Sequence, residues 1–446
     1  FHIAGILKYN NYSFDILEQY TSIVDRDNPK TFKIWNSITT NKPFAIFGLQ
    51  SIAKKVNESG YYQWLQKYCE YISIETLSAG ANDICQFISK SLINTLVFTN
   101  GSWLTCNKDN LWITIKDPSA IIVSAIQADI DKTMKLKTDL LSKSDTTDDV
   151  KDKLRADIKQ LVNYRVATNN QMNSYTKLLM TYLSNDDFYS CLDTNKYEVA
   201  FKNGVLDLRT LNFRVGILPT DFLTKTIPFD YMKANEEDKN FVRNELKKIT
   251  NNSETHLNYY LSILGYAMTG DASRIQEFYY LLGQKACNGK SVVFEALTEI
   301  MPNYVVKTGN DIFEKNNNTR HKEMARWNGI RICWADELTK NKQDVELLKE
   351  LTNGTSLTYK ALYKNSVVLN VLFSLFIVSN HTLNFDIDEG LKRRLRTLQM
   401  DSEFVTDLAE NDEANCRFKR DNTFGIKLCN EYKYASLELI FDYSKQ

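Results

Sequence analysis

The segment from Gln276 to Met301 constrains the fold more than any other part of the chain. A β-rich run, Phe278–Leu282, leads into a loop, and Asn288-Gly289-Lys290-Ser291 then opens a helix over Val292–Ile300. The N–H groups and the dipole at the start of such a helix attract an anion, and a lysine beside them reaches the phosphates of a nucleotide. The segment therefore predicts a phosphate-binding loop, with a simple strand–helix turn as the alternative.

The loop departs from the usual spacing in its first half. Five residues separate Gly283 from Gly289 instead of four, and Gln284 stands where the first glycine belongs. This puts Gly283 in question as a ligand but leaves Lys290 in place. Ser291 follows the lysine directly, and its hydroxyl is suited to Mg²⁺.

Polar side chains follow two later apolar strands. Asp336 and Glu337 end the run that begins at Gly329, and Asn380 follows the strand Val371–Val378. If these strands lie beside the phosphate loop, Asp336 reaches the Mg²⁺ held by Ser291, Glu337 polarises the attacking water, and Asn380 orients that water. The alternatives are a solvated turn for the two acids and an Asx cap for the asparagine.

Basic residues gather shortly after this strand, in the segment Lys392-Arg393-Arg394-Leu395-Arg396. The ordinary interpretation is a solvated helix face. The other is an arginine finger inserted into the ATP site of a neighbouring subunit, which accelerates hydrolysis by ~10³–10⁵ in enzymes that use one.

Length and composition bound the remaining possibilities. At roughly 150 residues per domain, 446 residues predict about three domains, and few glycines and prolines (16 and 6) favour helix. Lys plus Arg equal Asp plus Glu at 55 each, so nucleic-acid binding requires locally concentrated charge. The longest apolar stretch, Val367–Val378, is shorter than the ~20 residues that span a bilayer, and we expect no membrane association. Because the chain begins with Phe1, we expect it to lack an N-terminal part.

Hydrophobic periodicity outlines the order of elements. Strands alternate with helices over 275–400, which favours an α/β domain with a parallel core. The other segments are a mostly helical region over 1–100, a β-like stretch from Gly101, a long amphipathic region over 119–183 interrupted near 143–152, two short strands over 201–215, a helix over 239–249 and a last helical segment over 424–443.

The order of these motifs resembles that of the superfamily 3 helicases. NGKS, then Asp-Glu, a Lys-rich hairpin, a strand ending in Asn and then Arg-Arg-Leu follow one another as in these AAA+-like ATPases. The stretches 201–214, 221–231 and 264–271 resemble the domain before the helicase core in the poxvirus and phage primase–helicases, most of all the poxvirus nucleoside triphosphatases. The resemblance covers about residues 100–446.

The resemblance implies a fold and an assembly. We expect an α/β AAA+-like P-loop ATPase core over 251–400, a largely helical N-terminal collar over 1–100, a pre-helicase domain with a small β element over 101–250, and a helical C-terminal lid over 401–446. The chain would form a homo-hexameric ring that uses ATP and Mg²⁺ to translocate on single-stranded and forked DNA. Primase activity would come from a domain that precedes this chain.

The resemblance also assigns roles to residues. ATP phosphates would lie against the segment Cys287–Ser291, with Mg²⁺ at Ser291 and Asp336. Catalysis would involve Lys290, Glu337 and Asn380, completed by a finger. Arg394 fits the finger best because a leucine follows it, and Arg393 is the close alternative.

DNA would be contacted by a hairpin between the acidic strand and the Asn strand. Lys360, Tyr363 and Lys364 lie in this interval, and lysines with interleaved tyrosines suit phosphate contact and base stacking. A surface hairpin is the alternative. The resemblance further implies viral replication proteins, such as a polymerase processivity factor, as partners, and the host cytoplasm as location. An AAA+ protein remodeller and a catalytically decayed scaffold around DNA stay open as rival functions.

Overall fold

The computed structural model describes residues 81–142, 148–164, 169–283, 287–315, 320–339, 343–354, 356–360, 366–382, 388–407 and 411–445. The chain divides into two compact units, which are described separately. The helical prediction for residues 1–80 lies outside the described residues. Within the part that the structure describes, no helix is long and apolar enough to cross a membrane.

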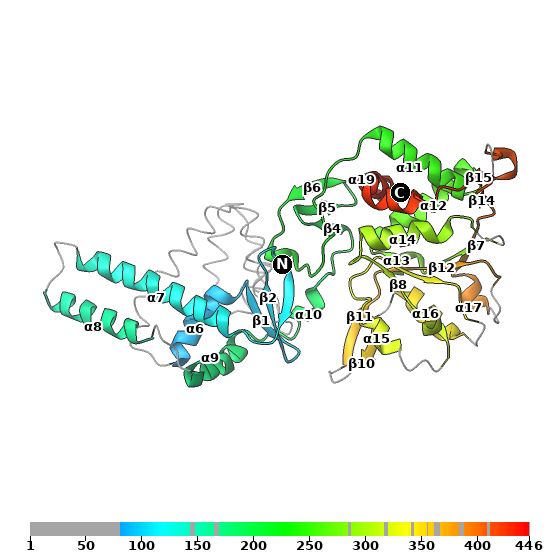
Figure 1. Ribbon diagram of the computed structural model, residues 1–446. Coiled ribbons are helices and arrows are strands. Elements are labelled where there is room, and N and C mark those ends of the chain that lie inside the picture. The colour runs from blue at the N-terminus through cyan, green and yellow to red at the C-terminus, as the bar shows by residue number, and fades with distance from the viewer. Residues whose placement is uncertain are drawn as a thin grey trace, which may run out of the picture. The chain divides into compact units, whose positions relative to one another are not determined.

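The first unit is a helical assembly with one small sheet (Figure 1). Helices α6 and α9 pack together around buried Cys85, Ile88 and Leu179, and the predicted amphipathic region forms three helices. The elements are α6 (Ala81–Leu92), β1 (Leu96–Thr99), β2 (Ser102–Cys106), β3 (Trp112–Ile115), α7 (Ser119–Leu141), α8 (Asp148–Tyr164) and α9 (Asn169–Tyr182). The sheet order is β1-β2-β3.

The second unit begins with a small antiparallel sheet. Strands β4 (Glu198–Phe201), β5 (Gly204–Asp207) and β6 (Asn212–Val215) pair in sequence order, so the strands predicted around a turn in 201–215 are β5 and β6. A Cβ at Gly204 would lie 2.0 Å from the carbonyl oxygen of Arg214, so only glycine allows this close pairing.

Two helices then lead to the core. In α11 (Glu236–Ile249) the side chain of Asn235 accepts from the N–H of Asp238, and three acidic residues fill the first turn. This N-cap and the acids offset unpaired N–H groups and the dipole, so the helix starts three residues before the predicted Lys239. Helix α12 (Glu254–Met268) and the short α13 (Ala272–Ile275) follow.

A five-stranded parallel sheet forms the centre of the second unit, which confirms the predicted parallel core. Its order is β13-β7-β12-β9-β8, with β7 (Phe278–Leu282), β8 (Val305–Lys307), β9 (Ile332–Asp336), β12 (Ser374–Ser379) and β13 (Leu395–Gln399). Strands β7 and β12 are buried along their whole length, as expected where helices cover both faces.

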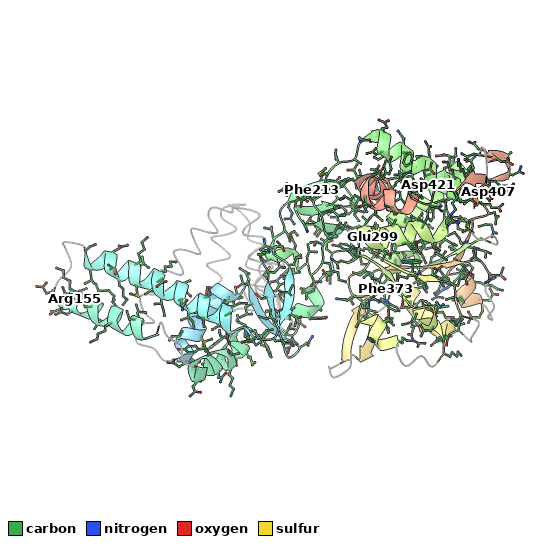
Figure 2. All side chains as sticks on the ribbon, viewed as in Figure 1. Arg155, Phe213, Glu299, Phe373, Asp407 and Asp421 are labelled. Carbon is green, nitrogen blue, oxygen red and sulfur yellow. The ribbon has the colours of Figure 1, made fainter. Side chains whose placement is uncertain are left out.

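Alternate residues of β7 pack into separate cores on the two faces of the sheet. Tyr279 and Leu281 meet α14 (Lys290–Ile300), while Tyr280 joins the core containing α16 (Val345–Asn353). Figure 1 shows α14 and α16 on opposite sides of the sheet, and Figure 2 labels the buried Phe373 of the α16 core. The shorter elements are η2 (Asn310–Phe313), α15 (Arg320–Met324) and α17 (Glu389–Lys392).

A hairpin lies between β9 and β12 in the chain, as predicted. Strands β10 (Ser356–Lys360) and β11 (Ser366–Asn370) are antiparallel, with Lys360 opposite Ser366. Because β11 takes the residues up to Asn370, the core strand β12 begins at Ser374 rather than at the predicted Val371.

The C-terminal segment is not wholly helical, which corrects the predicted lid. A parallel pair, β14 (Glu403–Val405) and β15 (Arg417–Lys419), precedes α18 (Phe424–Asn430) and α19 (Lys433–Asp442). The pair depends on tertiary contacts, because the rings of Phe404 and Phe418 pack 5.7 Å apart and the N–H of Phe404 donates to the carbonyl of Cys287, 2.9 Å away.

Candidate nucleotide-binding site

The phosphate loop passes from β7 into α14 through residues with special backbone conformations. Gly289 precedes the helix at φ 79°, and a Cβ there would lie 2.9 Å from Ile249 Cγ1. Cys287 also adopts a positive φ, of 60°. This tight turn places the first N–H groups and the positive end of the α14 dipole at the mouth of the loop. Gln284, Lys285 and Ala286 lie outside the described residues.

Lys290 is held inside the loop. Its side chain is buried, and its Nζ donates to the carbonyl of Gly283 at 3.3 Å and to Asn380 Oδ1 at 3.0 Å. Burial lowers the pKa of Lys290 to about 8, while Glu337, Asp336 and Asp401 act in the opposite direction. An ammonium with so little solvation gains much from an arriving anion.

Gly283 belongs to this arrangement despite the irregular spacing. A Cβ at this position would lie 2.1 Å from Asn288 Nδ2 and 2.6 Å from Lys290 Nζ. Any larger residue would therefore displace the lysine. The role of Gly283 is to leave room and to offer its carbonyl to Lys290.

Each of the two predicted acids accepts a hydrogen bond from a different residue of the site, Asp336 from Ser291 and Glu337 from Asn380. Asp336 ends β9, and its Oδ1 accepts from Ser291 Oγ at 3.4 Å. Glu337 follows at φ 51°, and its Oε1 accepts from Asn380 Nδ2 at 3.1 Å. Asn380 thus receives a hydrogen bond from Lys290 and donates one to Glu337. The carboxyl ends of β7, β9 and β12 bring the predicted groups together, as parallel strands at a ligand site do.

Lys290, Ser291, Asp336 and Asn380 line a cavity of about 370 Å³, whereas Glu337 is not among its lining residues. Its polar lining includes residues that sequence reasoning missed, Lys419 and Arg420 from the C-terminal segment. Nothing in Phe-Lys-Arg-Asp at 418–421 distinguishes it from an ordinary surface stretch. The full lining is Glu245, Ile249, Cys287, Asn288, Gly289, Lys290, Ser291, Val292, Asp336, Val378, Ser379, Asn380, Phe404, Lys419, Arg420, Asp421, Asn422, Phe424 and Gly425.

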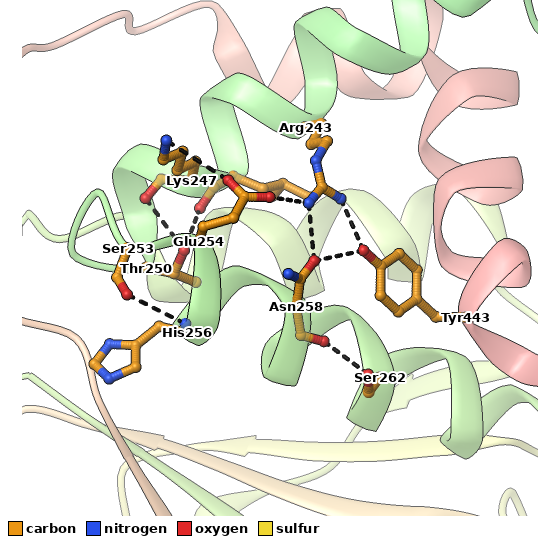
Figure 3. A network of polar contacts seen from close by, with 10 residues as sticks. Arg243, Lys247, Thr250, Ser253, Glu254, His256, Asn258, Ser262 and Tyr443 are labelled. Atoms are coloured by element: carbon orange, nitrogen blue, oxygen red, sulfur yellow. Dashed lines mark hydrogen bonds and ion pairs between the residues drawn. The ribbon is translucent and has the colours of Figure 1, made fainter. Parts of the chain in front are cut away.

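A polar network holds α11, which contributes Glu245 and Ile249 to the cavity (Figure 3). Arg243 donates to the Tyr443 hydroxyl and to Asn258 Oδ1, each at 2.8 Å, and the Tyr443 hydroxyl donates to the same Asn258 oxygen at 2.6 Å. The network ties α11 to α12 and to the C-terminal η4 (Tyr443–Lys445), so the wall of the cavity depends on residues far apart in the chain.

The two candidate finger residues lie in different environments. Arg394 is buried, donates to the carbonyl of Gly390 at 2.7 Å, and hydrogen-bonds Asn353 Oδ1 near the end of α16. Arg393 is exposed. Neither residue lines the cavity of its own chain.

The candidate DNA-binding residues are only partly described. Lys360 is the last residue of β10, and Tyr363 and Lys364 lie outside the described residues.

Comparisons with known proteins find a match to one family model and similarity to three viral proteins. Residues 98–279 match the family model described as D5 N terminal like. The chain is 30% identical over 243 residues to the putative helicase L207/L206 of Acanthamoeba polyphaga mimivirus, covering 53% of this chain and 24% of that protein. It is 30% identical over 247 residues to the putative helicase 121R of Invertebrate iridescent virus 3, covering 52% and 26%.

The similarity is partial and distant. The putative helicase 184R of Invertebrate iridescent virus 6 is 26% identical over 306 residues, which is 61% of this chain and 30% of that protein. The chain thus spans 24–30% of the length of these relatives. Among solved structures, the apo C-terminal region of NrS-1 aligns with a TM-score of 0.43 at 10% identity, covering 81% of this chain and 71% of that one. The narrower likeness to the poxvirus group stays a prediction.

Proposed function

We propose that the chain is the ATP-hydrolysing motor of a DNA helicase. The observation that carries this proposal is that Lys290, Ser291, Asp336 and Asn380 line one cavity at the ends of three adjacent parallel strands. Glu337 does not line the cavity and joins these residues through its hydrogen bond with Asn380. The similarity to proteins named putative helicases supports the choice among nucleotide hydrolases.

The oxygen donors fit a magnesium ion. The Ser291 hydroxyl and the Asp336 carboxylate are hard ligands 3.4 Å apart. The described residues hold no cluster of three or more His, Cys, Asp or Glu side chains, at this site or at another. Mg²⁺ commonly takes one or two protein ligands and completes its shell with phosphates and water. When bound, the ion would neutralise charge on the transferring phosphoryl group.

The hydrogen bonds suggest how the site responds to nucleotide. Lys290 donates to Asn380, and Asn380 donates to Glu337. Phosphates that draw Lys290 away leave Asn380 Oδ1 without its donor, so Asn380 is free to turn towards the γ-phosphate. Glu337 is then released to accept a proton from the attacking water.

Coupling to DNA is assigned to the β10–β11 hairpin in a hexameric ring. The hairpin ends at Asn370 and β12 begins at Ser374, so the strand whose far end leads to Asn380 connects the hairpin to the site. In the ring, Arg393 is the better-placed finger because it is exposed, whereas Arg394 is already bonded within its own chain.

The test is ATP turnover by the full chain with and without single-stranded DNA. We expect DNA to stimulate turnover with steep salt dependence, and Lys290→Ala to abolish turnover in both conditions. Lys360→Ala combined with Lys364→Ala should weaken DNA binding and flatten its salt dependence. Stimulation by unfolded polypeptide instead of DNA would favour a protein remodeller, and no turnover at all would favour a scaffold.

A further inference from the structure

Lys307 is a charged residue beside the site that the proposed mechanism does not use. It ends β8, and its Nζ lies 3.3 Å from Asp336 Oδ2. The same ammonium lies 4.5 Å from the centre of the Trp334 ring. Because Lys307 and Trp334 are paired across β8 and β9, the sheet itself brings the lysine to the metal side of the site.

Asp336 is therefore shared between two groups. One carboxylate oxygen accepts from Ser291 and the other faces Lys307. An ammonium occupies the oxygen that a cation beside Ser291 would need, so the lysine and a metal compete for the same carboxylate.

The charges nearby point the same way. Lys290, Lys419 and Arg420 line the cavity opposite Glu245, Asp336 and Asp421, and Lys307 and Glu337 add one basic and one acidic side chain beside it. Without nucleotide, the basic and acidic side chains at the site are therefore equal in number. A divalent ion entering alone would leave the ammonium groups of Lys290 and Lys307 beside it with no added anion. A nucleotide triphosphate brings the missing negative charge.

We propose that Lys307 is an internal counter-ion that makes metal binding at Asp336 conditional on nucleotide. This inference rests on the proposed function of the same site. When a metal ion takes Asp336 from Lys307, the ammonium still has a favourable contact, because it lies over the face of the Trp334 ring. The ring is itself fixed, since Trp334 is fully buried and its Nε1 donates to Thr298 Oγ1 at 2.9 Å.

The test measures Mn²⁺ binding by electron paramagnetic resonance, using the full chain without nucleotide. Lys307→Met removes the charge and keeps an apolar stem over Trp334. Lys307→Arg keeps the charge. Lys322→Met removes one charge from an exposed position on α15 and serves as the matched control. An ammonium about 5 Å from a divalent ion in a water-like dielectric weakens metal affinity roughly tenfold, so Lys307→Met should bind Mn²⁺ roughly tenfold more tightly than the other proteins.

A second measurement uses a non-hydrolysable ATP analogue. Binding of nucleotide and metal should be cooperative in the unmodified chain, and the cooperativity should fall roughly tenfold in Lys307→Met, whichever ligand is added first. A merely structural lysine would lower thermal stability without changing this coupling. Equal, or equally undetectable, Mn²⁺ binding by the unmodified chain and Lys307→Met overturns the inference. Failure of the unmodified chain to bind the analogue with Mg²⁺ overturns the proposed function instead.

Discussion

Lys290 should make the stability of the nucleotide-free chain depend on pH. The lysine is buried, and its hydrogen bonds go to the neutral oxygens of Gly283 and Asn380. Its pKa is lowered from 10.5 to about 8. Between these two values the unfolded chain binds the proton that the folded chain has lost. The unfolded state therefore holds more protons, and the free energy of unfolding rises with pH through this window.

The magnitude follows from the two pKa values. At pH 7 the buried ammonium of Lys290 destabilises the fold by about 3 kcal/mol, falling to about 2 kcal/mol at pH 9 and about 1 kcal/mol at pH 10. The unmodified chain should thus gain about 1 kcal/mol between pH 7 and pH 9 that Lys290→Met does not gain. Other titrating groups contribute equally to both proteins, so they cancel in this difference.

The assay is scanning calorimetry of both proteins at pH 7 and pH 9. The quantity compared is the unfolding transition of the second unit, which contains Lys290. Lys322→Met, which removes an exposed lysine, should show the pH dependence of the unmodified chain. Identical pH dependence in the unmodified chain and Lys290→Met would refute the reasoning, because the lysine would then carry no desolvation penalty. Nucleotide affinity should also fall as pH rises above 8, since the free chain loses the charge that binds phosphate.

Three further changes test the site. Glu337→Gln should keep ATP binding, measured by calorimetry, and lose at least ~100-fold in turnover, because the amide accepts no proton; lost binding would assign Glu337 a structural role. Arg394→Ala should lower the free energy of unfolding by about 2 kcal/mol, since it removes charged hydrogen bonds in a buried place, whereas Arg393→Ala should stay within about 0.5 kcal/mol; equal losses by denaturant titration would contradict this difference. Tyr443→Phe should cost about 1 kcal/mol by removing the hydroxyl's bonds to Asn258 and Arg243, and an unchanged unfolding midpoint would show that these two bonds contribute nothing.

Local patterns predicted much of the core because their causes are local. A strand buried on both faces is a continuous apolar run, and a helix that starts at Gly289-Lys290-Ser291 presents its first N–H groups together with a lysine. Asp336 and Asn380 could be predicted at a common site because parallel strands end at the same edge of a sheet. Periodicity also predicted the helical character of 119–183, whereas the β10–β11 hairpin was expected only from the resemblance to the superfamily 3 helicases.

The long-range contacts were decided by tertiary structure alone. Nothing near Lys307 in the sequence indicates that β8 and β9 pair and place it on Asp336. Arg394 and Arg393 are neighbours with the same chemistry, yet only the packing of α16 against α17 buries the first and leaves the second exposed. The bond from Phe404 to Cys287 joins residues more than 100 positions apart. The spacing of residues along a chain indicates where helices and strands form and where helix dipoles point. The partner of a strand or of a charged residue depends instead on which surfaces bury each other in the folded chain.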